Sequence, residues 1–280
     1  MNKKLLGTIL ALFVTTALGM ATNALNVCYD GNVNCTPAYK ADIYGAATAG
    51  SPIIVLIHGG GFIGGSKSNV TSVAQDLQSY GYAVMNINYT LAVPPPPGSP
   101  SYPQAVNDCY TAISYINAHA GTYNGDGSKI IVFGVSAGGT LSQSVANTQP
   151  PPNQGVVVAS IGFYALCQLY NLPVGQPEAD DVAYYLGQRC DEPPVPDLCH
   201  TASPYDSINS HTVPTGLWHA YNDTVVPVDQ SIQFFASLQS FHIYCQLTTV
   251  PNLAHGFLTN ATYTHELDGQ AVAFLKHLGY

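Results

Sequence analysis

Two short runs of apolar, mostly β-branched residues each end abruptly in a cluster of glycines, and this feature constrains the fold most. IIVLI at residues 53–57 is followed by HGGGF, and IIVF at 130–133 is followed by GVSAGG. Runs that are apolar at every position are typical of strands buried on both faces of a parallel sheet. A strand of this kind that stops at small residues delivers its last side chains to one edge of the sheet.

Strand-like runs alternate along the chain with longer stretches that carry a helical pattern. Strands are expected at 53–57, 83–89, 129–133, 156–163, 214–220 and 243–250. Helices are expected at 70–80, 102–120, 137–147, 228–239 and 268–278. This alternation predicts an α/β fold built from βαβ units, with a mostly parallel central sheet covered by helices on both faces.

One segment, at about 165–211, interrupts the alternation and is rich in proline, with two cysteines in its second half. We interpret it as an insertion between core strands. Two readings stay open: it forms a lid or one wall of a pocket, or it is a disulfide-stapled surface loop with no role in binding.

Residues 1–24 are typical of a secretory signal peptide and are excluded from the fold. Two lysines precede an apolar stretch from Leu5 to Leu18 that is too short for a comfortable membrane span, and residues 22–24 offer a cleavage site. The alternative is an uncleaved membrane anchor. We therefore expect one domain over residues 25–280, in a secreted or periplasmic protein with no integral membrane segment after signal removal.

The charge of the chain excludes several classes of partner. The formal net charge is −9, and removal of the two N-terminal lysines makes it −11. An acidic chain with so few basic residues argues against binding to nucleic acid and against docking on anionic lipid.

All seven cysteines lie beyond residue 24. An exported chain can keep disulfides. The pairs Cys28–Cys35 and Cys190–Cys199 are favoured because each closes a short, loop-like segment. The odd count leaves at least one thiol free or paired between chains. No CxxC motif or Cys/His ligand spacing is present, so a zinc site is not expected.

Ser136 stands in the motif Gly-x-Ser-x-Gly, between a predicted strand and a predicted helix. A serine hydroxyl is a poor nucleophile until it is presented and its proton is removed. A sharp strand-to-helix turn presents it, and such a turn requires small residues at positions 134 and 138. The alternative is a glycine turn with an incidental serine. We predict that Ser136 is the nucleophile of an acyl-transfer enzyme.

The glycine run after the strand at 53–57 provides backbone N–H groups for an oxyanion hole. A tetrahedral intermediate needs two or three such donors, and we assign the N–H groups of Gly60, Gly61 and Ala137 to this role. The run lacks the spacing of a dinucleotide-binding motif and the lysine of a phosphate-binding loop. Both absences argue against a phosphate-binding site. His58, at the end of the strand, suits bracing of the loop better than the role of a base.

A base and an orienting acid are expected after the serine, each in a loop that follows a strand. Asp223 follows the strand at 214–220, and His255 follows the strand at 243–250. The rival acids and bases do not stand in these loops: Asp180, Asp206, Asp229, His211, His219 and His265. His219 is expected to pack near the end of its strand. The sequence therefore predicts a Ser136–His255–Asp223 triad that needs no metal or organic cofactor.

The motifs that surround these residues resemble those of a known enzyme family. They are HGGGF at 58–62, GVSAGG at 134–139, NDTVVP at 222–227 and AHGF at 254–257. Together they resemble α/β-hydrolase esterases of the hormone-sensitive-lipase-like kind, and more loosely the secreted feruloyl and acetyl-xylan esterases. The resemblance spans roughly residues 38–279, and it implies that ADIYG at 41–45 is the first strand. This chain departs from the family pattern at Val135, where many lipase-like relatives carry an acidic residue.

The sequence predicts a secreted serine carboxylesterase that hydrolyses small, short-chain or soluble carboxylic esters through an acyl-enzyme on Ser136. The base must be neutral to accept a proton, so we expect activity to fall below about pH 6–7. Three alternatives stay open: a lipase for long acyl chains, a peptidase of related fold, and a non-catalytic hydrolase-fold binding module. Tyr164, Tyr170, Tyr184 and Tyr185 are candidates for stacking on a substrate ring, or else members of the core.

Overall fold

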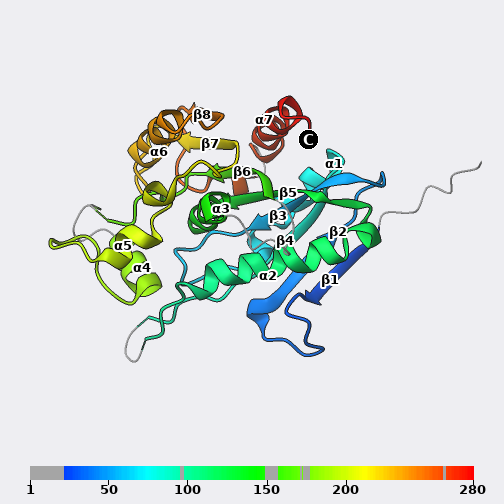
Figure 1. The fold of residues 1–280 in the computed structure, drawn as a ribbon, viewed down its shortest axis with the longest axis horizontal. Coiled ribbons are helices and arrows are strands. Elements are labelled where there is room, and N and C mark those ends of the chain that lie inside the picture. The colour runs from blue at the N-terminus through cyan, green and yellow to red at the C-terminus, as the bar shows by residue number, and fades with distance from the viewer. Residues whose placement is uncertain (1–21, 95–97, 149–156, 171, 173–176, 261–262) are drawn as a thin grey trace, which may run out of the picture.

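The computed structural model describes residues 22–94, 98–148, 157–170, 172, 177–260 and 263–280, which form a sandwich of helices around one twisted sheet (Figure 1). The sheet has eight strands in the order β1-β2-β4-β3-β5-β6-β7-β8. The strands are β1 Asn23–Cys28, β2 Lys40–Tyr44, β3 Ser51–Ile57, β4 Ala83–Ile87, β5 Gly125–Val135, β6 Val157–Phe163, β7 Thr215–Ala220 and β8 Cys245–Val250. The helices are α1 Thr71–Ser79, α2 Gln104–Ala118, α3 Ala137–Thr148, α4 Pro177–Leu186, α5 Asp197–Ala202, α6 Asp229–Ser240 and α7 Thr264–His277.

The predicted parallel α/β sheet is confirmed, with two antiparallel strands added at one edge. β3 through β8 pair in parallel, whereas β1 pairs antiparallel to β2 and β2 antiparallel to β4. Because parallel strands end at the same edge, the loops after β3, β5, β7 and β8 meet there. This edge is where ligands bind in sheets of this kind.

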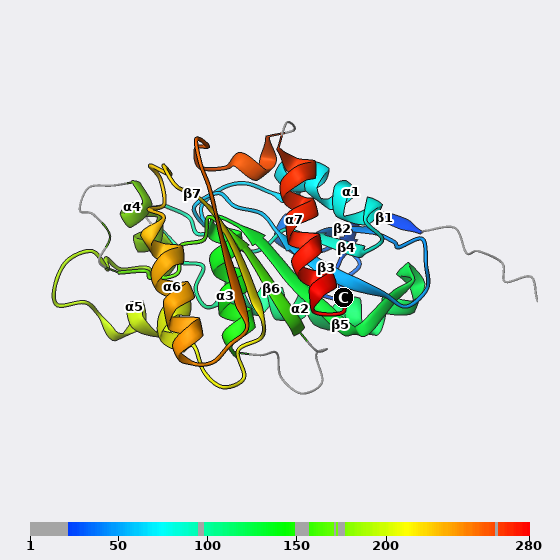
Figure 2. The ribbon, with the colours of Figure 1, turned by 90° about the horizontal axis from the view of Figure 1, so that it is seen from above.

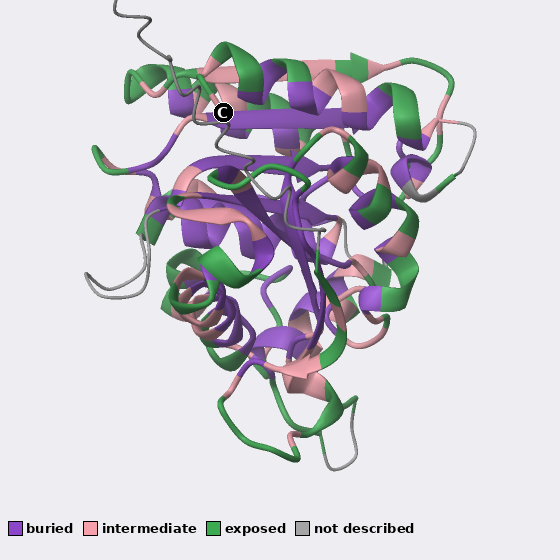
Figure 3. Ribbon diagram, turned by 90° about the vertical axis from the view of Figure 1, so that its right-hand side faces the viewer, coloured by how far each residue is buried: buried purple, intermediate pink, exposed green. Residues whose placement is uncertain are grey.

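Each central strand is apolar on both faces because both faces are covered by helices (Figures 2 and 3). In β3, Ile53, Val55 and Ile57 pack into the cluster that contains α2 and α3. Ile54 and Leu56 point the other way, into the cluster that contains α1 and α7. The five apolar side chains of this run, all with 0% exposure, therefore fill two cores rather than one.

The N-terminal edge strand departs from the sequence prediction. The sequence of β1 carries no apolar pattern, so no strand was expected there. In the structure, its residues are exposed or only partly buried. Asn23 belongs to this strand, and its side chain accepts hydrogen bonds from Gly45 and Gln78. The strand thus overlaps the last two residues of the predicted signal segment, whose residues 1–21 lie outside the described part of the chain. None of the described helices is both long and apolar enough to cross a membrane.

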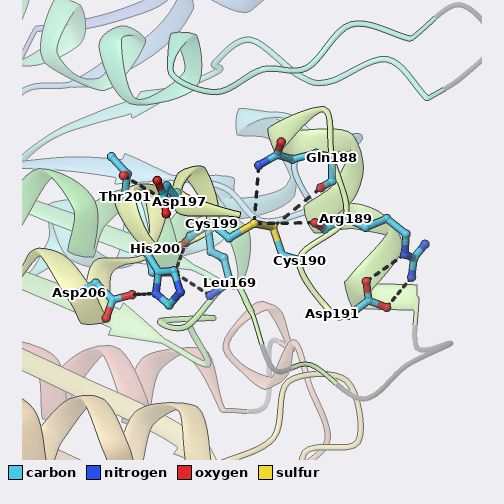
Figure 4. The surroundings of a disulfide bond; sticks show 11 residues. Leu169, Gln188, Arg189, Cys190, Asp191, Asp197, Cys199, His200, Thr201 and Asp206 are labelled. Atoms are coloured by element: carbon cyan, nitrogen blue, oxygen red, sulfur yellow. Dashed lines mark hydrogen bonds and ion pairs between the residues drawn. A yellow bond between two sulfur atoms is a disulfide. The ribbon is translucent and has the colours of Figure 1, made fainter. Parts of the chain in front are cut away.

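The segment between β6 and β7 contains α4 and α5, neither of which the sequence pattern indicated. The disulfide Cys190–Cys199 joins the loop after α4 to α5, as expected from the spacing (Figure 4). Arg189 forms ion pairs with Asp180 and Asp191 beside it. The second predicted disulfide, Cys28–Cys35, is also present, while Cys109, Cys167 and Cys245 are unpaired.

Candidate active site

Ser136 occupies a strained turn between β5 and α3. Its backbone has φ 54°, in the left-handed region that residues other than glycine rarely adopt. A Cβ at Gly134 would lie 1.9 Å from the carbonyl oxygen of Gly138, and a Cβ at Gly138 would lie 2.2 Å from that of Ile57. The turn is held by a hydrogen bond from the Ser136 N–H to Phe163 O (2.9 Å) in β6. Only glycines at these two positions let the chain present the hydroxyl in this way.

The structure brings Ser136, His255 and Asp223 into one hydrogen-bonded chain. His255 Nδ1 lies 2.8 Å from Asp223 Oδ2, and His255 Nε2 lies 2.9 Å from Ser136 Oγ. A carboxylate oxygen can only accept, so the imidazole proton is assigned to Nδ1, and Nε2 accepts the hydroxyl proton. The ring is therefore in the tautomer that allows it to act as a base toward the serine.

Asp223 is held in its charged form by donors on both oxygens. Oδ1 accepts the N–H groups of Val225 and Val226, each at 2.9 Å. Burial by itself would raise the pKa of this carboxyl, but the imidazoles of His219 and His255 and the Val225 N–H hold the pKa well below its usual range. A buried carboxylate that is fully supplied with donors can stabilise the imidazolium that forms when His255 accepts a proton.

The loop after β3 places two glycines in the pocket that contains Ser136. Gly60 and Gly61 have φ 122° and 61°, and the Gly60 carbonyl closes the loop by accepting from the N–H groups of Ile63 and Gly64. Both glycines line the same pocket as Ser136 and Ala137. Ala137 begins α3, so its N–H has no partner within the helix. The three residues predicted to donate to the oxyanion thus line one pocket with Ser136.

His58 is buried in the same loop and makes no contact with the three-residue chain. Its Nδ1 lies 2.6 Å from Gly59 O, and its ring stacks on Tyr89 at 4.4 Å. Burial lowers the pKa of His58 to about 4, although the contact with Gly59 opposes the shift. These contacts fit the expectation that His58 braces the loop.

The rival acids and bases have other partners. Asp180 pairs with Arg189, Asp206 with His200, and His265 with Asp76. Asp229 stands in the first turn of α6, and His211 lies on an exposed loop. His219 is the exception, because it lies directly behind Asp223.

The pocket above Ser136 has a volume of about 470 Å³, a size that accepts a small organic molecule. Its wall is mostly apolar and includes Leu166, Val182 and Val226. Two carboxyl groups from α4, Glu178 and Asp181, also line it, and no lysine or arginine does so among the described residues. The insertion between β6 and β7 therefore contributes one wall of the pocket.

Asp181 lies against the oxyanion loop, a contact that sequence reasoning missed. Its Oδ2 is so close to Gly61 that a Cβ there would lie 2.1 Å away. Burial raises the pKa of Asp181 to about 6, and the charges of Glu178 and Asp180 add to the effect. The two segments are 120 residues apart in sequence, so no local pattern could have indicated the contact.

The four candidate stacking tyrosines have different environments. Tyr164 lines the pocket and packs edge-on against His255 at 4.7 Å, with 1% exposure. Tyr185 is fully buried and stacks on Phe62 at 4.0 Å, and Tyr170 bonds Asp206. Tyr164 therefore packs against the imidazole of His255, Tyr170 and Tyr185 belong to the core, and Tyr184 does not line the pocket.

Cys28, Asp30 and Cys35 form the one group of three potential metal ligands among the described residues. Both thiols are consumed by their disulfide. This group is therefore not a metal site, and it lies away from Ser136.

Known proteins with similar sequences include esterases, hormone-sensitive lipases and acylamino-acid-releasing enzyme 1 of Oryza sativa subsp. japonica, which is 30% identical over 82% of this chain and 31% of its own. Esterase LipC of Mycobacterium tuberculosis is 24% identical over 79% of this chain and 57% of its own. Hormone-sensitive lipase of Bos taurus is 34% identical over 34% of this chain and 12% of its own. The chain spans 31–57% of the length of LipC, of the Oryza sativa enzyme and of two further esterases of Mycobacterium tuberculosis, LipM and LipQ, that match over most of this chain.

Solved structures share the fold across nearly the whole chain. A truncated carbohydrate esterase from gut microbiota superimposes with a TM-score of 0.76 over 92% of this chain and 98% of its own, at 21% identity. The sequence model of the BD-FAE family matches residues 41–238, which include Ser136, Asp223 and the glycine-rich loop. The predicted relationship to hormone-sensitive-lipase-like esterases of the α/β-hydrolase fold is thus confirmed, and the chain belongs to the BD-FAE family.

Proposed function

We propose that the protein is a serine carboxylic ester hydrolase that acts through an acyl-enzyme on Ser136. The observation that carries the proposal is the chain Ser136 Oγ–His255 Nε2–Asp223, with links of 2.9 and 2.8 Å, at the floor of a pocket lined by the glycine loop. Family membership and the relatives named as esterases or carboxylic ester hydrolases support the same reaction class.

The proposed cycle has two similar halves. Ser136 attacks the ester carbonyl while His255 Nε2 takes its proton, and His255 then gives that proton to the leaving alcohol. The N–H groups of Gly60, Gly61 and Ala137 bind the oxyanion, at the positive end of α3. Water then attacks the acyl-enzyme with His255 again as the base, which releases the acid and restores Ser136.

Small, soluble esters are the proposed substrates. The helices of the insertion span ten residues in α4 and six in α5, which is shorter than the long amphipathic helix expected over the site of an interfacial lipase. The carboxyl groups of Glu178 and Asp181 in the pocket wall disfavour anionic esters by repulsion. Neutral, short-chain esters fit a pocket of this size and charge.

We further propose that the protein works outside the cytoplasm. The signal-like residues 1–24 and the two disulfides support an exported protein, because such bonds persist in oxidising compartments. N-terminal sequencing of the mature protein recovered from the culture medium or periplasm tests this. A protein found only in the cytoplasm with both cysteine pairs reduced contradicts it.

A ladder of p-nitrophenyl esters from acetate to palmitate, with methyl ferulate added, tests the activity. We expect turnover that is highest for short chains and that Ser136→Ala abolishes, while Ser240→Ala, an exposed serine at the end of α6, retains it. Activity confined to long chains would make the protein a lipase. No turnover of any ester by the folded protein would contradict the proposal and favour a peptidase or a binding module.

A further inference from the structure

His219 lies at the far end of the hydrogen-bonded chain, behind Asp223 as seen from Ser136. It is the last residue but one of β7 and is fully buried. Its Nδ1 lies 2.7 Å from Ser231 Oγ in α6, and its Nε2 lies 2.8 Å from the carbonyl oxygen of Val226. Both ring nitrogens therefore have partners, and the ring is fixed in one orientation.

The contact with Val226 shows where one ring proton lies. A carbonyl oxygen can only accept, so Nε2 carries a hydrogen whatever the charge of the ring. The same nitrogen lies 3.4 Å from Asp223 Oδ2, the oxygen that accepts from His255 Nδ1. His219 Nε2 thus donates its hydrogen to the Val226 carbonyl and lies close to this carboxylate oxygen. In a water-excluded site, such a donor acts strongly on a neighbouring charge.

His219 also fixes the loop that supplies the other donors to Asp223. The peptide N–H groups of Val225 and Val226 bind Oδ1, and the carbonyl of Val226 is held by His219. The imidazole thus acts twice on Asp223, once beside Oδ2 and once through the loop. His219 therefore influences both oxygens of the carboxylate, in addition to the hydrogen bond that His255 donates to Oδ2.

We propose that His219 is a positioning residue that keeps Asp223 ionised and aimed at His255. It does not line the pocket, so it touches no substrate and acts only through Asp223. The inference rests on the proposed function, because the consequence concerns the power of His255 as a base. Loss of His219 should therefore lower kcat and leave KM nearly unchanged.

Two amide variants that differ in reach by one methylene group test the proposal. The amide nitrogen of His219→Gln can replace Nε2 beside Asp223 and Val226. The shorter amide of His219→Asn reaches only the Ser231 side of the ring. We expect His219→Asn to lose about 10- to 100-fold in kcat, the range found when supporting partners of active-site ligands are removed, with KM within about twofold. His219→Gln should retain about tenfold more activity than the Asn variant. The control is His242→Asn, an exposed histidine with φ 59°, a conformation that asparagine tolerates.

The proton on His255 Nδ1 gives a second readout that needs no substrate. Its NMR resonance lies far downfield while it is shared with Asp223, and we expect His219→Asn to shift or broaden it. His219→Gln and His242→Asn should leave it near its wild-type position. If the Asn variant does not fold, the Gln variant decides: a retained resonance supports the proposal, and a lost one overturns it.

Equal losses of kcat in the Gln and Asn variants would overturn the proposal, and so would an Asn variant with the kcat and resonance of the wild type. A wild-type protein that hydrolyses no ester would instead contradict the proposed function. In that case the resonance comparison still tests whether His219 positions Asp223.

Discussion

Asp223 and Asp268 are both buried aspartates, yet their surroundings drive their charge in opposite directions. Asp223 receives N–H donors on both oxygens, and the pKa of its carboxyl is lowered. Asp268, on α7, finds no hydrogen-bond donor for either oxygen among the described residues and faces Asp76 on α1. Burial, with the charge of Asp76 added, raises the pKa of Asp268 to about 9. The comparison shows that the supply of donors, and not burial, decides which buried acid is charged.

Replacing Asp223 should cause the largest change. Asp223→Asn keeps the shape but removes the charge and lets the amide donate to His255, which favours the wrong tautomer. We expect kcat to fall by about 10⁴-fold, as in triads of other hydrolases. Steady-state kinetics on p-nitrophenyl acetate measures this. Asp268→Asn is the matched control and should keep kcat within about twofold; equal losses in both would erase the distinction between the two acids.

Asp268 should instead control the pH dependence of stability. An unfolded aspartate titrates near pH 3.9, whereas the folded pKa is about 9. Between these values the folded protein binds the extra proton, so its free energy of unfolding falls as the pH rises, by up to about 1.4 kcal/mol per unit. Asp268→Asn removes this loss. The difference in the free energy of unfolding between the variant and wild type should therefore grow in favour of the variant by about 2–4 kcal/mol from pH 5 to pH 8.

Urea denaturation at several pH values measures this gain. Glu266→Gln, an exposed carboxyl on the same helix, is the control and should show no such trend. A constant difference between Asp268→Asn and wild type across the pH range would mean that Asp268 is charged in the folded protein, like Asp223.

The pKa of Asp181 lies between those of Asp223 and Asp268, and replacing Asp181 should have the smallest effect. With a pKa of about 6, it is neutral at pH 5 and negative at pH 8. The preference for p-nitrophenyl butyrate over p-nitrophenyl hemisuccinate should therefore rise by about three- to tenfold over this range. The ratio of kcat/KM values cancels any pH dependence that the two substrates share. Asp181→Asn should flatten the ratio, and a wild-type ratio independent of pH would contradict a charged Asp181 in the pocket.

Most of the site follows from local sequence because each residue stands in a loop just after a predicted strand. Ser136 and the glycine loop follow β5 and β3, and Asp223 and His255 follow β7 and β8. Parallel strands bring such positions to one edge, so strand prediction alone brings the residues together. The motifs around them then indicate the family.

The remaining features depend on contacts between distant segments. β1 is an edge strand with little buried surface, so its sequence carries no strand pattern. α4 and α5 are short and sit among prolines, which signal loops. The raised pKa values of Asp181 and Asp268 arise from packing between elements. His219 was expected to be a packed residue, and its place behind Asp223 depends on how the loop folds back.

Mass spectrometry of the acyl-enzyme tests the central claim most directly. The protein is mixed with p-nitrophenyl acetate, quenched in acid during the initial burst and digested. The account predicts one acetyl group per molecule on the peptide that contains Ser136, and none in Ser136→Ala. Ester turnover with no adduct on this peptide, or with an adduct on another residue, would contradict it.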